Sequence, residues 1–169
     1  ASLSGGEGVI AADACERNGF RMAKMGEETK AILKDYFPPW DIPMNPFDLG
    51  VSMQFHATDL DSFFKALGSA LRDENVDCML MQTLVMFQHT EHIISRKKLL
   101  SLMDRSVDSI LSMSDGKKPL VLWRSTMDRV EDDYVAKLEL KRVPVFPSAD
   151  RAMRALSAIS NYADRKRAG

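Results

Sequence analysis

Apolar runs of strand length alternate with helical patterns along this chain, and one of these runs constrains the fold more than any other feature. Residues 76–85 (VDCMLMQTLV) are predominantly apolar, without the strict alternation of a half-exposed strand. Such a run is typical of a parallel strand that helices cover on both sides. The alternation predicts an α/β fold, a three-layer, doubly wound parallel sheet of the flavodoxin-like type.

The predicted elements cover most of the chain. Strands are expected at residues 20–23, 76–85, 119–124 and 143–146, and helices at 8–18, 27–36, 58–73, 91–114, 128–140 and 148–162. Gly19 is expected to end the first helix, Thr58 or Asp59 to cap the third, and Ser148 to cap the last. Residues 38–50 contain four X-Pro steps, which predict a loop.

The composition excludes several classes of protein. The 169 residues carry 23 basic and 24 acidic side chains, and this net charge of −1 argues against nucleic acid as a partner. No apolar run approaches the roughly 18 residues that cross a bilayer, and no secretory signal is visible, so no membrane is expected. The two cysteines form no CxxC pair, which is typical of a reduced, cytoplasmic protein.

The length fits one domain. Only residues 1–3 precede the first glycine-rich turn, where a strand should stand. We therefore expect residues 1–169 to form a single flavodoxin-like domain, a piece of a larger multidomain protein whose first strand is truncated.

That glycine-rich turn is the clearest binding signal. Ser4, Gly5, Gly6, Glu7 and Gly8 stand at the start of the first predicted helix. Glycines let an anion approach backbone N–H groups, and a helix start adds unpaired donors and a partial positive charge. The spacing is neither that of a P-loop nor GxGxxG, so the turn predicts a phosphate site and disfavours direct nucleotide binding. A plain tight turn is the alternative, and the Glu7 carboxylate would have to point away from a phosphate.

The sequence NPFDLG at residues 45–50 is the second signal. Asn45, Pro46 and Asp48 are expected to lie near the site or to shape a ligand or subunit surface, because Asn and Asp side chains stabilise turns. A purely structural latch is the alternative.

The same proline-rich loop contains the apolar side chains of Trp40, Met44 and Phe47. Apolar side chains in a loop predict a contact surface that partner domains cover. The isolated chain is therefore expected to self-associate, as a homodimer.

No catalytic residue and no metal site is predicted. His89 and His92 lie three positions apart, but no set of cysteines or carboxylates completes a metal site with them. No Ser-His-Asp or Cys-His arrangement is readable, so no residue stands out as a nucleophile.

Four stretches, taken together, resemble the family of NDP-forming acyl-CoA synthetases, relatives of succinyl-CoA synthetase. SGGEGVIAADACERNGF resembles the family's pattern GGxGVxAADxxExxG, and NPFDLG resembles its NPxDL loop. GKKPLVLW resembles its GKP segment with the following strand, and RVPVFPSADRAMRALSAISNY resembles its last strand and closing helix. The stretches occur in the family's order and cover nearly the whole chain. The chain looks like the second flavodoxin-like domain of that family.

The resemblance implies a domain of an acid–thiol ligase. The helix start at Gly5, Gly6, Glu7 and Gly8 would face a phosphohistidine on a neighbouring domain and stabilise its phosphoryl group, with Glu7 standing where the family often has proline. The implied partners are the CoA-binding, phosphohistidine and ATP-grasp domains of the same enzyme, and a small-molecule acyl substrate. The resemblance implies no cofactor for this domain alone, and CoA, ATP/ADP and Mg for the complete enzyme. The isolated chain is expected to be inactive.

Two other functions stay open. A non-catalytic sensor or regulatory domain of an acyltransferase fusion would carry the same motifs, and an unrelated flavodoxin-like binding domain would share only the fold. An ATP-grasp module and an intact phosphohistidine loop elsewhere in the protein would favour the ligase, whereas bound flavin would favour the unrelated binding domain.

Overall fold

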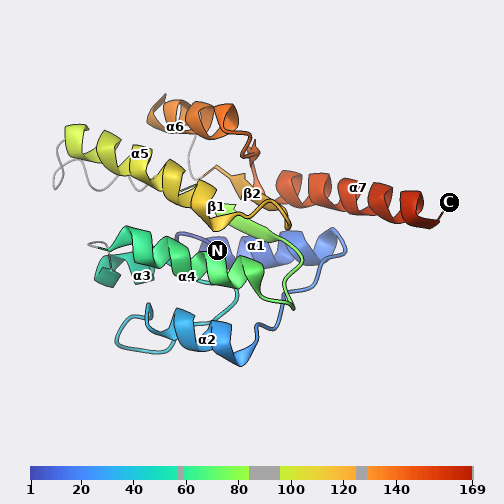
Figure 1. The fold of residues 1–169 in the computed structure, drawn as a ribbon, viewed down its shortest axis with the longest axis horizontal. Helices are drawn as coiled ribbons and strands as arrows, with labels where there is room; N and C mark the ends of the chain where they lie inside the picture. Colours follow the sequence, from blue (N-terminus) through green and yellow to red (C-terminus); the bar gives the residue numbers. More distant parts are fainter. Residues whose placement is uncertain (57–58, 84–95, 125–128, 169) are drawn as a thin grey trace.

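The computed structural model describes residues 1–56, 59–83, 96–124 and 129–168. Its elements, in chain order, are α1 (Gly5–Arg17), α2 (Glu27–Lys34), α3 (Leu49–His56), α4 (Leu60–Arg72), β1 (Met79–Gln82), α5 (Arg96–Met113), β2 (Leu120–Trp123), α6 (Arg129–Leu140), β3 (Val145–Phe146) and α7 (Ala149–Ala168). The strands form a parallel sheet in the order β1-β2-β3, flanked by helices (Figure 1). The predicted α/β class is confirmed.

The first residues of the chain pair with β1 on the side away from β2. The amino group of Ala1 donates a hydrogen bond to the carbonyl of Leu80 over 2.8 Å. The amide of Gln82 in turn donates to the carbonyl of Ala1 over 3.0 Å. This alternating pattern is that of a parallel ladder.

Ser2 continues this sheet toward residues 47–49. Its amide donates to the carbonyl of Phe47 over 3.0 Å, and its carbonyl accepts from the amide of Leu49 over 2.7 Å, so that Ser2 and Asp48 form a parallel bridge. The spatial order is therefore the segment at Asp48, the segment at Ser2, β1, β2 and β3. This is the 2-1-3-4-5 order of flavodoxin-like folds.

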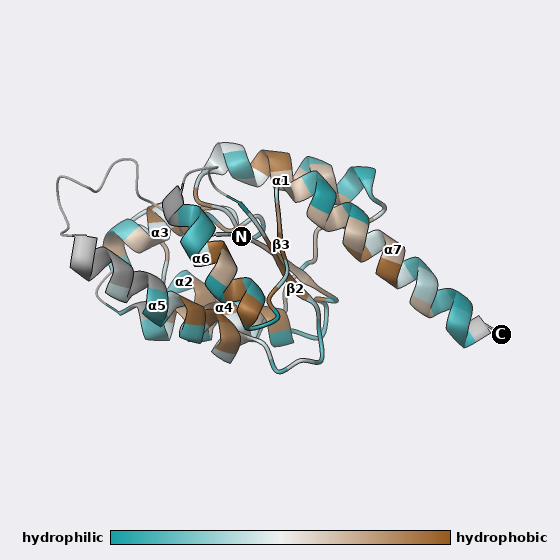
Figure 2. Ribbon diagram, turned by 90° about the horizontal axis from the view of Figure 1, so that it is seen from above, coloured by the Kyte–Doolittle hydropathy of each residue, from teal (hydrophilic) through white to brown (hydrophobic). Residues whose placement is uncertain are grey.

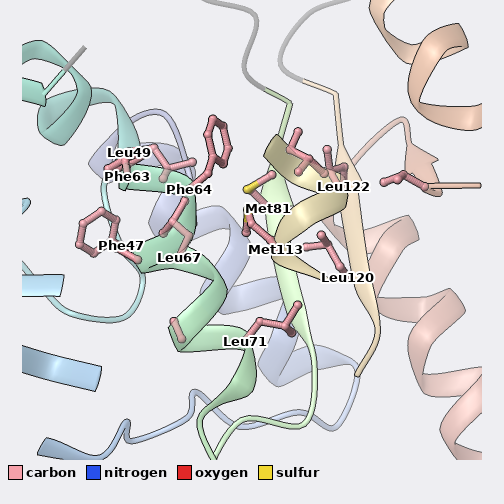
Figure 3. Packing of buried hydrophobic residues seen from close by; sticks show 14 of the residues in the cluster. Phe47, Leu49, Phe63, Phe64, Leu67, Leu71, Met81, Met113, Leu120 and Leu122 are labelled. Atoms are coloured by element: carbon pink, nitrogen blue, oxygen red, sulfur yellow. The ribbon is translucent and has the colours of Figure 1, made fainter. Parts of the chain in front are cut away.

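Helices cover both faces of the sheet, and alternate strand residues reach two separate hydrophobic cores. On one face, α1 and α7 pack closely through small side chains; the core there consists of Ala11, Ala14, Leu80, Val121, Trp123, Ala149, Ala152, Met153 and Leu156. On the other face, Leu67 and Leu71 of α4 and Met113 of α5 lie near Met81, Leu120 and Leu122 (Figure 3). Figure 2 shows these helix layers on opposite sides of the strands.

The last turns of α7 extend beyond the sheet (Figures 1 and 2). Ile159 and Tyr162 on this extension are 62% and 69% exposed. They form no part of either core.

Most predicted elements are confirmed with ends that differ by a few residues, but the predicted strand at 20–23 is wrong. Arg21 and Met22 are exposed, whereas a strand inside a doubly covered sheet buries both faces. The segment at Asp48 occupies the expected place of that strand in the sheet. The predictions for residues 84–95 and 125–128, with His89 and His92, fall outside the described residues.

Helix α3 was not predicted. Its apolar residues Leu49, Val51, Met53 and Phe55 alternate with small or polar ones, which is the spacing of a strand. The segment is nevertheless helical, and the carboxylate of Asp48 satisfies an amide of its first turn, that of Val51, over 3.1 Å.

The predicted helix ends are confirmed at three places. Gly19 follows α1 with a positive φ of 82°. The Asp59 carboxylate accepts a hydrogen bond from the Ser62 amide over 3.2 Å, so Asp59 caps α4. The hydroxyl of Ser148 accepts one from the Arg151 amide over 3.3 Å at the start of α7.

Asp73, at the end of α4, holds the start of α2 in place. Its carboxylate accepts hydrogen bonds from the amides of Gly26 (2.8 Å) and Asn75 (2.9 Å), and the residue is 8% exposed. Burial raises the pKa of this carboxyl, but hydrogen bonds from Thr29, Asn75 and Gly26 outweigh burial and hold the pKa below its ordinary value of 3.8. A lowered folded-state pKa means that Asp73 stabilises the fold above its ordinary pKa, and that this contribution is lost as the pH falls through the folded-state pKa.

Asp73→Asn should lower the free energy of unfolding by about 2 kcal/mol at neutral pH, because a charged acceptor of two hydrogen bonds is lost. Urea unfolding measures this loss, which should shrink toward about pH 3 as the wild-type carboxylate becomes protonated. Asp77→Asn, at an exposed position nearby, is the matched control and should change the free energy by less than about 0.5 kcal/mol. Equal losses in the two variants would contradict the role of Asp73.

Gly50, in the first turn of α3, lies against the segment at Ser2. A Cβ at Gly50 would lie far inside van der Waals contact with the carbonyl oxygen of Leu3. The backbone cannot easily move apart there, because the hydrogen bonds of Ser2 hold residues 47–49 beside it. At Gly5 the nearest atom to an added Cβ is a carboxylate oxygen of Asp48, 3.9 Å away.

Gly50→Ala should therefore lower the free energy of unfolding by about 2 kcal/mol or more, through overpacking. Gly5→Ala, the matched control, should leave it unchanged or raise it slightly, because alanine favours the helix. Thermal unfolding followed by circular dichroism compares the two. Similar melting temperatures would show that Gly50 and Leu3 do not pack as described.

Candidate phosphate-binding site

The glycine-rich stretch forms the first turn of α1 rather than a turn before it. Ser4 is the N-cap: its hydroxyl accepts a hydrogen bond from the Glu7 amide over 3.3 Å, and its carbonyl accepts one from Gly8 over 3.0 Å. The predicted helix start at residue 8 is thus three residues late. A helix leaves its first amides without intrahelical partners, and within the described part of the chain those of Gly5 and Gly6 have no acceptor. Both residues are exposed, so an anion can approach them.

The NPFDLG loop lies beside this turn, although the two motifs are some 40 residues apart. A Cβ added at Gly8 would lie 3.1 Å from Pro46 and 3.1 Å from the hydroxyl of Ser2, so Gly8 is packed against the loop. Asp48 is also close, since one of its carboxylate oxygens would lie 3.9 Å from a Cβ added at Gly5. The structure therefore brings Pro46 and Asp48 to the start of α1.

Asn45 has a different position. Its side-chain amide donates to the carbonyl of Ala23 over 3.1 Å and so ties the loop to the segment before α2. For this residue the structural latch is the observed arrangement.

Glu7 is half-buried, in the first turn of α1. No side chain in the described ranges forms an ion pair with its carboxylate. A carboxylate in this turn stabilises the helix dipole, but it also repels an anion at the neighbouring amides.

The start of α1 lies at the carboxyl edge of the sheet, between the segment at Ser2 and β1. Strand order reverses between these two, and ligands of doubly wound sheets bind outside the carboxyl ends of strands at such a point. Gln82, the last residue of β1, accepts a hydrogen bond through its side-chain oxygen from the Leu3 amide over 2.8 Å. Sequence reasoning missed Gln82, because it reads as one polar residue inside an apolar strand.

A buried polar cluster occupies the same edge beyond β1. Thr83 donates a hydrogen bond to the fully buried carboxylate of Glu131, and Arg124 lies 3.5 Å from the same carboxylate. Burial lowers the pKa of Arg124, but the carboxylates of Asp132 and Glu131 outweigh burial and raise it. These contacts link the ends of β1 and β2 to α6. The sequence carried no motif that would have indicated them.

A cavity lies at the opposite edge of the sheet, near the start of β1. It has a volume of about 1140 Å³ and is lined by both cysteines, with Arg21 and Asn75 among other residues. Burial raises the pKa of the Cys78 thiol to about 11 and also raises that of Cys15. Both thiols are therefore protonated at neutral pH and are poor nucleophiles.

The predicted contact surface needs one correction. Trp40 is 56% exposed and forms an edge-to-face pair with Phe55, whereas Phe47 is 4% exposed and packs between Phe37 and Phe63 in the core. The carbonyl of Phe47 accepts the hydrogen bond from the Ser2 amide, and this pairing holds residue 47 against the sheet with its side chain in the core.

The described residues carry neither a metal-ligand group nor a membrane-spanning helix. They contain no group of three His, Cys, Asp or Glu side chains that could hold a metal ion. His56 instead lies 3.4 Å from the carbonyl of Phe37. Among the described helices, none is long and apolar enough to cross a bilayer.

Comparison with known proteins relates the chain to acyl-CoA ligases. No model of a known protein family matches it. It is 28% identical over 163 residues to the alpha subunit of ADP-forming acetate–CoA ligase I from Pyrococcus furiosus, covering 96% of this chain and 32% of that subunit. It is 26% identical over 159 residues to ADP-forming acetate–CoA ligase I from Archaeoglobus fulgidus, covering 94% of this chain and 20% of that protein.

Solved structures share the fold. The dinucleotide-forming acetyl-coenzyme A synthetase 1 of Candidatus Korarchaeum cryptofilum superposes with a TM-score of 0.66 and 24% identity, over 96% of this chain and 32% of that one. A second structure of that enzyme, in complex with phosphate and ADP, matches equally well. The chain thus spans 20–32% of the relatives' length. Sequence and fold together confirm the resemblance to the NDP-forming acyl-CoA synthetases and relate nearly the whole chain to one segment of the ADP-forming acetate–CoA ligases.

Proposed function

We propose that the chain is one domain of an ADP-forming acyl-CoA synthetase, in which the start of α1 stabilises the phosphoryl group of a phosphohistidine carried by a neighbouring domain. One observation carries this proposal: the exposed amides of Gly5 and Gly6 have no acceptor in the described part of the chain and lie at the reversal point of the sheet. The names of the relatives support the choice of reaction.

The chemistry of phosphoryl transfer fits a site of this kind. The transferred group needs positioning and stabilisation of its charge more than covalent help from protein side chains. Backbone amides and the helix dipole supply both without titrating, so they act equally well over a wide pH range. The raised pKa values of the Cys15 and Cys78 thiols are compatible with that role.

The remaining parts of the enzyme are proposed from the relatives, which are three to five times longer than the matched segment. CoA-binding, phosphohistidine and ATP-grasp domains would supply the sites for CoA, ATP or ADP with Mg, and the acyl substrate. This domain would then be inactive alone. A homodimer stays a prediction.

The outward face of α1 supports a partner at this place. Val9 and Ile10, one turn beyond Gly6, are 60% and 53% exposed. Further along the helix the exposed side chains are charged, as at Asp13 and Glu16. Apolar exposure is thus confined to the end that carries the unpaired amides. We propose that the domain presenting the phosphoryl group covers Val9 and Ile10 when it docks.

Gly6→Val should slow phosphorylation of the partner histidine at least tenfold, about 1.4 kcal/mol in the barrier, because a branched side chain would crowd the amide that binds the phosphoryl group. The fold should survive, since the nearest atom to an added Cβ is the Ser4 hydroxyl oxygen at 4.0 Å. Labelled ATP and the full-length gene product measure the rate, with Gly6→Ala as a milder control. Gly8→Val is unsuitable, because its Cβ would press on Pro46 and Ser2. An unchanged rate in Gly6→Val would show that this helix start does not bind the phosphoryl group.

Ile10→Lys should lower the same rate by about fivefold or more, because a charged side chain would be buried when the partner domain docks. The melting temperature should stay the same, since Ile10 is already exposed in this domain. Ile159→Lys places the same charge on the distant extension of α7 and is the matched control. If both variants phosphorylate at the wild-type rate, another surface receives the partner.

A further inference from the structure

The hydrogen-bond ladder between the first residues and β1 changes its acceptor at Leu3. Ala1 forms two hydrogen bonds with the backbone of β1: its amino group donates to the carbonyl of Leu80, and its carbonyl accepts from the amide of Gln82. In a regular parallel ladder the next donor, the amide of Leu3, would reach the backbone carbonyl of Gln82. It donates instead to the side-chain oxygen of Gln82, over 2.8 Å. The side chain thus replaces a backbone acceptor at the point where the chain leaves the sheet.

Gln82 is itself fixed by burial and by a backbone hydrogen bond. The residue is 3% exposed, and its own amide donates to the carbonyl of Ala1 over 3.0 Å. Only Ser4 separates Leu3 from Gly5, the first residue of α1. A displacement of Leu3 would therefore carry the amides of Gly5 and Gly6 with it.

We propose that Gln82 is a positioning residue of the candidate phosphate-binding site: its side-chain oxygen fixes Leu3 and thereby sets the direction of the Gly5 and Gly6 amides. This inference rests on the proposed function of that turn. The chemistry of the side chain agrees with it. An apolar residue would leave the Leu3 amide unpaired, and a carboxylate would accept the same bond but add a negative charge close to a bound anion. A neutral acceptor satisfies both requirements.

Gln82→Met removes the acceptor and so tests positioning, whereas Gln82→Glu keeps the acceptor and tests how close the side chain lies to a bound anion. The test follows the amide signals of Gly5 and Gly6 by ¹⁵N–¹H spectroscopy while the chain is titrated with sulfate between about pH 5 and pH 8. Sulfate keeps the same charge over this range, so a change with pH belongs to the protein. A buried carboxyl has a raised pKa, so the new side chain is largely neutral at the acid end and becomes charged as the pH rises.

The ratio of the sulfate dissociation constant of Gln82→Glu to that of wild type should be close to one at about pH 5. It should rise to about ten at about pH 8, where the new side chain is charged. Gln54→Glu, an exposed position on α3, is the matched control and should stay within about twofold throughout, because water screens its charge. Gln82→Met, which loses the acceptor, should weaken binding about fivefold and shift the Gly5 and Gly6 signals even without sulfate.

The outcomes are distinguishable. If sulfate does not shift the Gly5 and Gly6 signals of the wild-type chain, the proposed phosphate site is wrong and this inference falls with it. If wild type binds sulfate and Gln82→Met leaves both the sulfate affinity and the Gly5 and Gly6 signals as in wild type, the site stands and Gln82 has no positioning role. Weaker binding with shifted signals in Gln82→Met supports the inference when Gln82→Glu, which keeps the acceptor, has signals close to those of wild type at about pH 5. Gln82→Asn, whose shorter side chain does not reach Leu3, replaces the Met variant if that variant does not fold.

Discussion

The pairing of Ser2 with residues 47–49 is the interaction on which the candidate site depends. Ser2 is bonded to Phe47 and Leu49 through its backbone, and it is 1% exposed. Because Ala1 simultaneously bonds β1, the first residues form the central link between the loop and the rest of the sheet. Two helices, α1 and α3, begin directly after these paired segments and at the same edge. Their partial positive ends therefore lie close together.

The proposed site would stabilise charge rather than perform acid–base chemistry. The strongly shifted side chains of the described residues lie elsewhere: Cys78 lines the cavity at the opposite edge, and burial raises the pKa of Tyr134, which pairs with Ser106 in the core, to about 12. The Glu131 carboxylate accepts a hydrogen bond from Thr83 and lies beside Arg124. What the carboxyl edge offers to an anion is backbone amides. In the proposed function these donors would act on a group that another domain presents, and the chain spans 20–32% of its relatives.

Sequence patterns predicted the buried strands and the long helices well, because apolar spacing reports burial directly. The apolar run containing Met81 became β1, and Leu67 and Leu71 face the core from α4 as their spacing indicated. Sequence patterns did not predict the features that depend on contacts between residues far apart in the chain. The alternation in α3 reads as a strand, yet the Asp48 cap and the close contact of Gly50 with Leu3 belong to a helix start. The role of Gln82 was invisible, because it arises from a bond across 79 positions.

The central claim is that the amides of Gly5 and Gly6 receive a phosphoryl group presented by another domain. A structure of the full-length gene product, phosphorylated or bound to phosphate, tests it most directly. We expect phosphate oxygens within hydrogen-bond distance, about 2.7–3.2 Å, of both amide nitrogens, with Val9 and Ile10 covered by the domain that presents the group. A phosphoryl group bound elsewhere, with both amides satisfied by a protein acceptor, would contradict the account.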